Sequence, residues 1–191
     1  MTELKLEKIQ LNKVRLGSYP SIFEKSNIGD KYQIKVYLDK IIHKSNIETL
    51  NKKIDAALEA KGLVKGRLDG KNICLRDVDN LDKKDLDNAW QLTCKSSNEI
   101  DIRSANLDKI LSKDASPFYP GCLVNVCFSL YVYNGKPKGS DVIVKGISAS
   151  LHGIQFVAHT ERLTPNYNDC TGVFSAVEQE EINNLESEFG F

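Results

Sequence analysis

The sequence predicts a mainly β protein whose strands close into a small, strongly bent barrel. Residues Gly121 to Tyr133 alternate between apolar and mixed side chains, and Tyr32 to Lys40 alternates in the same way. A period of two is typical of strands that are buried on one face. In a third strand, Leu4 to Leu16, the apolar parity slips at Asn12-Lys13. A β-bulge there would keep the apolar side inward and bend the strand, which favours a barrel.

Shorter apolar stretches complete the β structure. We expect further strands at Ile73 to Arg76, Ala89 to Lys95 and Val142 to Ser150, and a last short stretch at Ile154 to Ala158, which gives five to seven strands in all. The segment Ser18 to Gln33 contains Pro and Gly and is predicted to be a connection. Strand-rich chains of this length form barrels or sandwiches.

One helix is predicted, over Asn46 to Lys61. Its apolar residues recur at helical spacing, and Ser45 or Asn46 can cap its first turn. Gly62 follows the helix and can end it in the left-handed conformation. The apolar stripe is expected to face the core.

Composition limits the class of protein. The chain has 191 residues, enough for one globular domain with a substantial core. It has no apolar run of membrane-spanning length and no secretory signal at its N-terminus, so we expect a cytoplasmic protein. Five scattered Cys and three separated His make a metal site improbable, and no cofactor motif is present. The thiols are expected to be reduced.

The charge is distributed unevenly along the chain. The whole sequence carries 26 basic and 26 acidic residues, but the segment from Glu178 to Phe191 holds 5 of the acids and none of the bases. The preceding part therefore has 26 basic against 26 − 5 = 21 acidic residues, a net charge of +5. A basic body with an acidic tail can bind a polyanion, with the tail as competitor or as a handle for partners.

Cations and aromatic residues share the outward faces of the predicted strands. Bases of single-stranded nucleic acid stack on aromatic rings while cations neutralise the phosphates. Trp90 has the parity of Leu92 and Cys94 and is expected in the core. The candidate phosphate contacts are Lys35, Arg76, Lys95 and Arg103, and the candidate base contacts are Tyr37, Tyr131 and Tyr133, with Asn125 on the same face.

Catalysis has little support in the sequence. No nucleophile elbow and no zinc-protease helix occur, and His159-Thr160-Glu161 lacks a marked nucleophile. A nuclease would need clustered carboxylates for metal ions, and the acids between Asp77 and Asp87 are better explained as a solvated loop. We therefore expect a protein that is not an enzyme.

Two longer stretches resemble phage single-stranded DNA-binding proteins. "RLGSYPSIFEKSNIGDKYQIKVYLDK", from Arg15 to Lys40, has the Arg-Leu, Tyr-Pro-x-x-Phe, Lys-Tyr and Asp-Lys pattern of that family. "YPGCLVNVCFSLYVYNG" from Tyr119, followed by "KGISASLHGIQFVAHTERL" from Lys145, is similar to a second signature of the same family. The resemblance extends from about Arg15 to the C-terminus.

The resemblance implies an OB-fold: a five-stranded barrel with additional strands and one inserted α-helix, in residues 1–177, followed by an acidic tail in residues 178–191. It implies a protein that coats single-stranded DNA in phage replication, recombination or repair, in the cytoplasm of the infected bacterial host. The tail would compete with DNA and recruit phage DNA polymerase or other replication proteins. The oligomeric state stays open, a homodimer included. The tail residues that match are Glu178, Glu180, Glu181, Glu186, Glu188, Phe189 and Phe191.

A protein of another class is the alternative: a non-catalytic β-domain for protein–protein interaction, with a disordered acidic tail. Such tails are common and often have no strong effect. Retention on single-stranded DNA with release at high salt distinguishes the two hypotheses, because phosphate contacts release counterions.

Overall fold

The fold is built around a closed five-stranded barrel. The computed structural model describes residues 7–27, 29–81, 86–136 and 141–163. Numbered in chain order, the five barrel strands are neighbours in the order 1-2-3-5-4, and the fourth strand pairs with the first to close the barrel. Neighbouring strands are antiparallel, except that the third and fifth are parallel to each other. This closed five-stranded arrangement is the expected OB-fold. In chain order the five strands are β1 (Ile9–Leu16), β3 (Lys31–Asp39), β5 (Ala89–Ser96), β7 (Leu123–Gly135) and β8 (Val144–Ala158).

Three short strands extend the barrel at its margins. β2 (Ser21–Ser26) pairs with β3, β4 (Leu75–Asp77) pairs with β5, and β6 (Asp101–Arg103) runs parallel to β8. The prediction that Ser18 to Gln33 is only a connection is wrong, because β2 lies within it. The two predicted strands near the C-terminus are one 15-residue strand, β8.

The first strand has the predicted bulge. Its register with β7 shifts between Leu11 and Val14, and Lys13 between them has a φ of 55°. Leu11 and Val14, which lie on either side of the shift, are both buried. The backbone N–H of Lys13, which leaves the ladder, donates to Asn125 Oδ1 at 3.0 Å. The bulge therefore keeps the apolar side chains in the barrel, as the slipped parity predicts.

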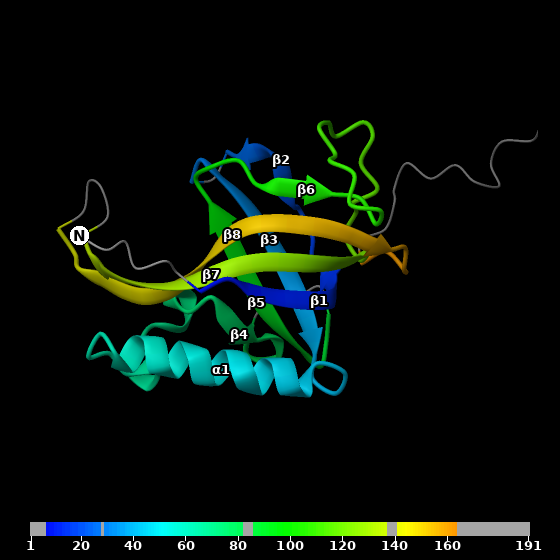
Figure 1. Cartoon of the computed structure of the whole chain (residues 1–191). Helices are drawn as coiled ribbons and strands as arrows, with labels where there is room; N and C mark the ends of the chain where they lie inside the picture. Colours follow the sequence, from blue (N-terminus) through cyan, green and yellow to red (C-terminus); the bar gives the residue numbers. More distant parts are fainter. Residues whose placement is uncertain (1–6, 28, 82–85, 137–140, 164–191) are drawn as a thin grey trace, which may run out of the picture.

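Helix α1 (Lys44–Glu59) lies along one side of the barrel (Figure 1) and contacts β7. The predicted apolar stripe faces the core, with Ile47, Leu50, Ile54 and Leu58 buried. Ser45 and Asn46 do not cap the helix. Instead, Asp39 Oδ1 accepts hydrogen bonds from the backbone of Ile41 and Ile42 in the preceding turn, at 2.8 and 2.9 Å.

The helix ends as predicted. Gly62 has a φ of +67°, and its N–H donates to the carbonyl of Glu59 at 2.8 Å. The next N–H, from Leu63, donates to Leu58 at 2.9 Å. Three short 3-10 helices follow in the chain: η1 (Lys65–Arg67), η2 (Gly70–Asn72) and η3 (Val78–Asn80). In the described part of the chain, no helix is long and apolar enough to cross a membrane.

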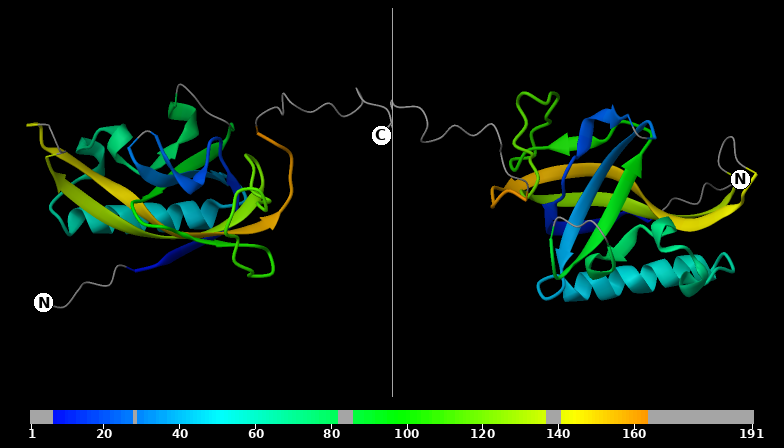
Figure 2. Two further views of the ribbon diagram at one scale, coloured as in Figure 1. Left: turned by 90° about the horizontal axis from the view of Figure 1, so that it is seen from above. Right: turned by 180° about the vertical axis from the view of Figure 1, so that it is seen from behind.

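The β7–β8 hairpin extends well beyond the barrel (Figure 1). Asn134 and Gly135, whose sequence favours a tight turn, are still paired strand residues here, opposite Lys145 and Val144. Seen from behind, β3 and β5 lie in front of the hairpin (Figure 2, right). The OB-fold binds oligonucleotides on the face of its second and third strands, which are β3 and β5 in this chain.

Candidate nucleic-acid interface

The outward face of β3 and β5 carries two exposed lysines. Lys35 pairs with Thr93 across the two strands, and Gln33 pairs with Lys95. Side chains alternate along a strand, so these residues point outward while Ile34 and Cys94 are buried. Neither lysine forms an ion pair with any residue that the structure describes. Two uncompensated positive charges therefore stand on the face where an OB-fold binds nucleic acid.

A large groove lies on one side of Thr93. It has a volume of 610 Å³, and Gln33, Lys35 and Thr93 line it from β3 and β5. β2 and the segment before it supply two aromatic residues, Tyr19 and Phe23, and Tyr19 is 85% exposed. The larger groove thus combines flat rings with three lysines, because Lys25 and Lys113 line it beside Lys35, and its one acidic lining residue is Glu24.

Sequence reasoning missed these aromatic residues because it treated their segment as a connection. The signal was available, since the Tyr-Pro-x-x-Phe pattern of the first signature contains both Tyr19 and Phe23. A pattern of that kind fixes residue identity, whereas strand parity finds only residues within regular strands.

A smaller groove of 150 Å³ lies on the other side of Thr93. Its lining includes Lys71, Arg76, Lys95 and Tyr133, and no acidic residue. The Nε of Arg76 is buried and has no hydrogen-bond partner among the described residues. Because Thr93 lines both grooves, they adjoin on one surface. Of the predicted site, the structure brings together Lys35, Arg76, Lys95 and Tyr133.

Packing fixes the position of Tyr133. It lies across from Gly146 in the hairpin, and a Cβ on Gly146 would overlap the Tyr133 hydroxyl and the carbonyl oxygen of Asn72. Burial raises the pKa of the Tyr133 hydroxyl further above its ordinary value. Tyr131 lies beside it, with ring centroids 6.4 Å apart and tilted by 52°. The hairpin thus presents two neighbouring rings near the smaller groove.

The prediction that Tyr37 stacks on a base is not supported by its position. Its side chain is only 2% exposed and packs in a small cluster with Val78 and Ala89. Its hydroxyl donates to Gln91 Oε1 at 3.2 Å. The parity is outward as predicted, but the chain between β4 and β5 covers this end of the face. Trp90, which was predicted to lie in the core, is partly buried and packs against the core.

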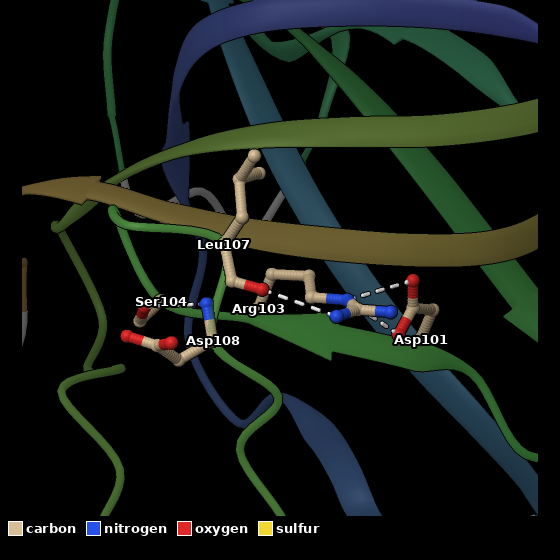
Figure 3. A network of polar contacts seen from close by, with 5 residues as sticks. All are labelled: Asp101, Arg103, Ser104, Leu107 and Asp108. Atoms are coloured by element: carbon tan, nitrogen blue, oxygen red, sulfur yellow. Dashed lines mark hydrogen bonds and ion pairs between the residues drawn. The ribbon is translucent and has the colours of Figure 1, made fainter.

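Arg103 and Asn125 lie elsewhere, around a separate cavity of 190 Å³. Arg103 Nε donates to both carboxylate oxygens of Asp101 at 2.9 and 3.0 Å, and its Nη1 donates to the Leu107 carbonyl at 3.1 Å (Figure 3). Asn125 donates to Gln155 at 2.8 Å. The structure therefore does not bring these two predicted contacts to the grooves, and Arg103 is already paired.

Two acids of the segment between Asp77 and Asp87 form ion pairs with one lysine. Lys40 contacts Asp77 at 2.8 Å and Asp79 at 2.6 Å, and these carboxylates raise the pKa of the lysine. Among the residues that the structure describes, no group of three or more His, Cys, Asp or Glu could hold a metal ion. Burial raises the pKa of Cys74 to about 12, so this thiol is an apolar group rather than a nucleophile.

Comparisons with known proteins place this fold in a family. The family model of the Enterobacter phage Enc34 ssDNA-binding protein matches residues 7–183. The chain belongs to this family. Protein p50 of Acyrthosiphon pisum secondary endosymbiont phage 1 is 26% identical over 192 residues, which covers 95% of this chain and 97% of p50. The resemblance seen in the two signatures is confirmed.

Solved structures of phage proteins share the fold of this Enc34-family chain. The single-stranded DNA-binding protein of bacteriophage Enc34 superposes with a TM-score of 0.70 at 19% identity, covering 88% of this chain and 90% of that one. The same protein in complex with ssDNA gives 0.66 at 21% identity, covering 81% and 88%. The bacteriophage T7 single-stranded DNA-binding protein gp2.5 gives 0.54 at 11%, covering 91% and 96%.

Proposed function

We propose that this chain binds single-stranded DNA without sequence preference, along the two adjoining grooves on the outward face of β3 and β5. Lys35, Arg76 and Lys95 neutralise phosphates, and Tyr133 with Tyr131 supplies stacking surface for bases. The observation that carries the proposal is the position of Lys35 and Lys95, which lie on the binding face of an OB-fold and form no ion pair with any described residue. Membership of the Enc34 family supports it.

The grooves suit a single strand better than a duplex. Unpaired bases expose their faces to rings such as Tyr19 and Tyr133, whereas the bases of a duplex are already stacked on one another. Contacts with phosphates and base faces carry no sequence information, so binding is expected to tolerate any sequence. The non-catalytic interaction domain with an acidic tail stays as the alternative that the experiment must exclude.

Fluorescence anisotropy with labelled oligo-dT, mixed-sequence single strands and a duplex of equal length tests the proposal over a series of salt concentrations. We expect similar affinity for the single strands, weaker binding to the duplex, and affinity that falls as salt rises. Equal affinity for duplex and single strand, or affinity independent of salt, would contradict the proposal.

We further propose that residues 1–177 form the binding domain and that residues 178–191 act as a tail, in phage DNA replication, recombination or repair. The tail lies outside the described residues, so its role rests on charge and on the family resemblance. Its five Glu would imitate phosphates and occupy the basic grooves until DNA displaces them, and Phe189 and Phe191 would anchor a replication protein such as the phage DNA polymerase.

Two full-length variants separate these roles of the tail. Replacing Glu178, Glu180, Glu181, Glu186 and Glu188 with Gln removes the competing charge and should tighten binding to oligo-dT at low salt. Replacing Phe189 and Phe191 with Ala should weaken capture of the polymerase. Unchanged or weaker DNA binding in the Gln variant would count against competition by the tail.

A further inference from the structure

A stack of aromatic and cationic side chains lies at the end of β8, outside both grooves. The guanidinium carbon of Arg162 is 4.5 Å from the centroid of the Tyr119 ring. On the same ring the imidazole of His159 lies nearly parallel, at 5.6 Å and 8°. His159 in turn contacts Phe156, with ring centroids 4.8 Å apart. We call these four residues the Tyr119 stack.

Hydrogen bonds hold the Tyr119 stack in place. The Tyr119 hydroxyl donates to the carbonyl of Thr160 and accepts from its N–H, both at 2.7 Å. Arg15 Nη2 donates to the carbonyl of Glu161 at 2.6 Å. Gly121 has a φ of +109°, and a Cβ there would overlap the Glu161 carbonyl oxygen, so glycine permits the close approach. The stack is therefore ordered before any ligand arrives, which reduces the entropic cost of binding.

Three residues of the stack, Tyr119, His159 and Arg162, line a cavity of 390 Å³ between residues 116–119 and the segment after β8. His159 and Arg162 are exposed, and Arg162 forms no ion pair within the described part of the chain. Aromatic faces beside an uncompensated guanidinium match a nucleotide, whose base stacks and whose phosphate accepts hydrogen bonds from arginine. The volume falls within the range of pockets that hold small ligands.

The cavity lies close to the larger groove. Lys113 lines that groove, and Ser116 of the same segment lines the cavity. Three residues of extended chain span at most about 11 Å. The segment between β6 and β7 (green in Figures 1 and 2) contributes to both sites. The Tyr119 stack is therefore within reach of a strand that leaves the larger groove past Lys113.

We propose that the Tyr119 stack is a second base-binding site, which holds a nucleotide of single-stranded DNA beyond the end of the larger groove. The base packs against the exposed imidazole of His159, and the Arg162 guanidinium donates hydrogen bonds to a phosphate. The inference rests on the proposed function, because it extends the same DNA path.

Affinity for oligo-dT of increasing length tests the proposal in the full-length protein. The variants are His159→Ala and Arg162→Ala, and the matched control is Arg67→Ala, which removes an exposed cation in η1. Short oligonucleotides held by the grooves alone should bind all four proteins nearly equally. Longer ones should bind His159→Ala about 5- to 150-fold more weakly, the loss expected for one stacked base.

Photocross-linking of the unaltered protein gives an independent readout. Oligo-dT carrying one 4-thiothymidine at successive positions should form adducts with Tyr119 or His159 only when the photoactive base is near one end of the bound strand. Arg162→Lys should keep most of the salt dependence and lose affinity, because lysine cannot reproduce the planar, stacked guanidinium.

The outcomes separate the two proposals. If oligo-dT binds but the variants match the unaltered protein at every length, and no adduct forms in residues 116–119 or 159–162, the second site is overturned and the grooves stand. If no oligonucleotide binds, the proposed function itself fails. Should a variant unfold in a thermal melt, the cross-linking result decides.

Discussion

The sharpest prediction concerns the two exposed lysines beside Thr93. Lys35 and Lys95 are outside the core and form no ion pair within the described residues, so replacing both with Ala should leave the melting temperature unchanged. If each neutralises one phosphate of a single strand, the slope of log affinity against log salt should fall in magnitude by about 0.7 per lysine, or about 1.4 in all. When the salt concentration rises fourfold, the double variant's fold-loss of affinity is then about sevenfold smaller than that of the unaltered protein.

The assay is anisotropy of labelled oligo-dT, titrated at several salt concentrations. A matched control replaces Lys44 and Lys61, exposed residues at the two ends of α1, with Ala. The control has the same net charge as the test variant but keeps the groove, so its slope should stay close to that of the unaltered protein. Equal slopes for the test variant and the unaltered protein would refute the placement of phosphates on β3 and β5. An equal fall in the control would mean that net charge, and not the grooves, sets the salt dependence.

Three further predictions concern the core and its polar contacts. Tyr37→Phe removes the hydrogen bond to Gln91 and should lower the free energy of unfolding by about 1 kcal/mol in urea titrations. DNA affinity should not change, and a fall in affinity would indicate that Tyr37 contacts DNA. Ile54→Ala should cost about 2–5 kcal/mol in the same titrations, because Ile54 is fully buried on α1, and a smaller loss would mean that the helix is loosely packed. Burial lowers the pKa of His152, which lies 2.9 Å from the Ser129 hydroxyl, so the unfolded chain binds its proton more readily. His152 should therefore have no effect on stability well above about pH 6.5 and should lower it as pH drops from there toward the lowered folded pKa. His152→Gln should flatten that part of the profile.

Long-range structure was predictable where one face of a strand is buried along its length. The parity slip at Asn12-Lys13 was visible because Leu11 and Val14 are both forced inward, and the bulge followed from that. β2 was missed because only Ile22 in it is buried, so the strand shows no alternation to detect. β8 was divided because Gly153 breaks the apolar pattern, although this glycine is a paired strand residue where β6 approaches closely.

The site was harder to predict because outward parity does not mean exposure. Tyr37 points outward from β3, yet Val78 and Ala89 cover it, and strand parity carries no information about that cover. Arg103 was treated as a free cation, although Asp101 stands two residues earlier on the same strand face and pairs with it. That spacing was readable in the sequence. The proximity of Lys113 and Ser116 to two different cavities was not, because it depends on how a long segment folds back.

The barrel is not equally strong around its circumference. β7 and β8 are joined by a ladder of thirteen residue pairs, whereas β1 with β3 and β5 with β8 are each joined by two pairs among the described residues. In the second of these joints, Cys94 pairs with Ala149 and Lys95 with Ser150. Lys95, which makes one of the two pairs between β5 and β8, also lines the smaller groove. A ligand that contacts Lys95 in this groove would therefore lie directly beside one of the barrel's two shortest joints.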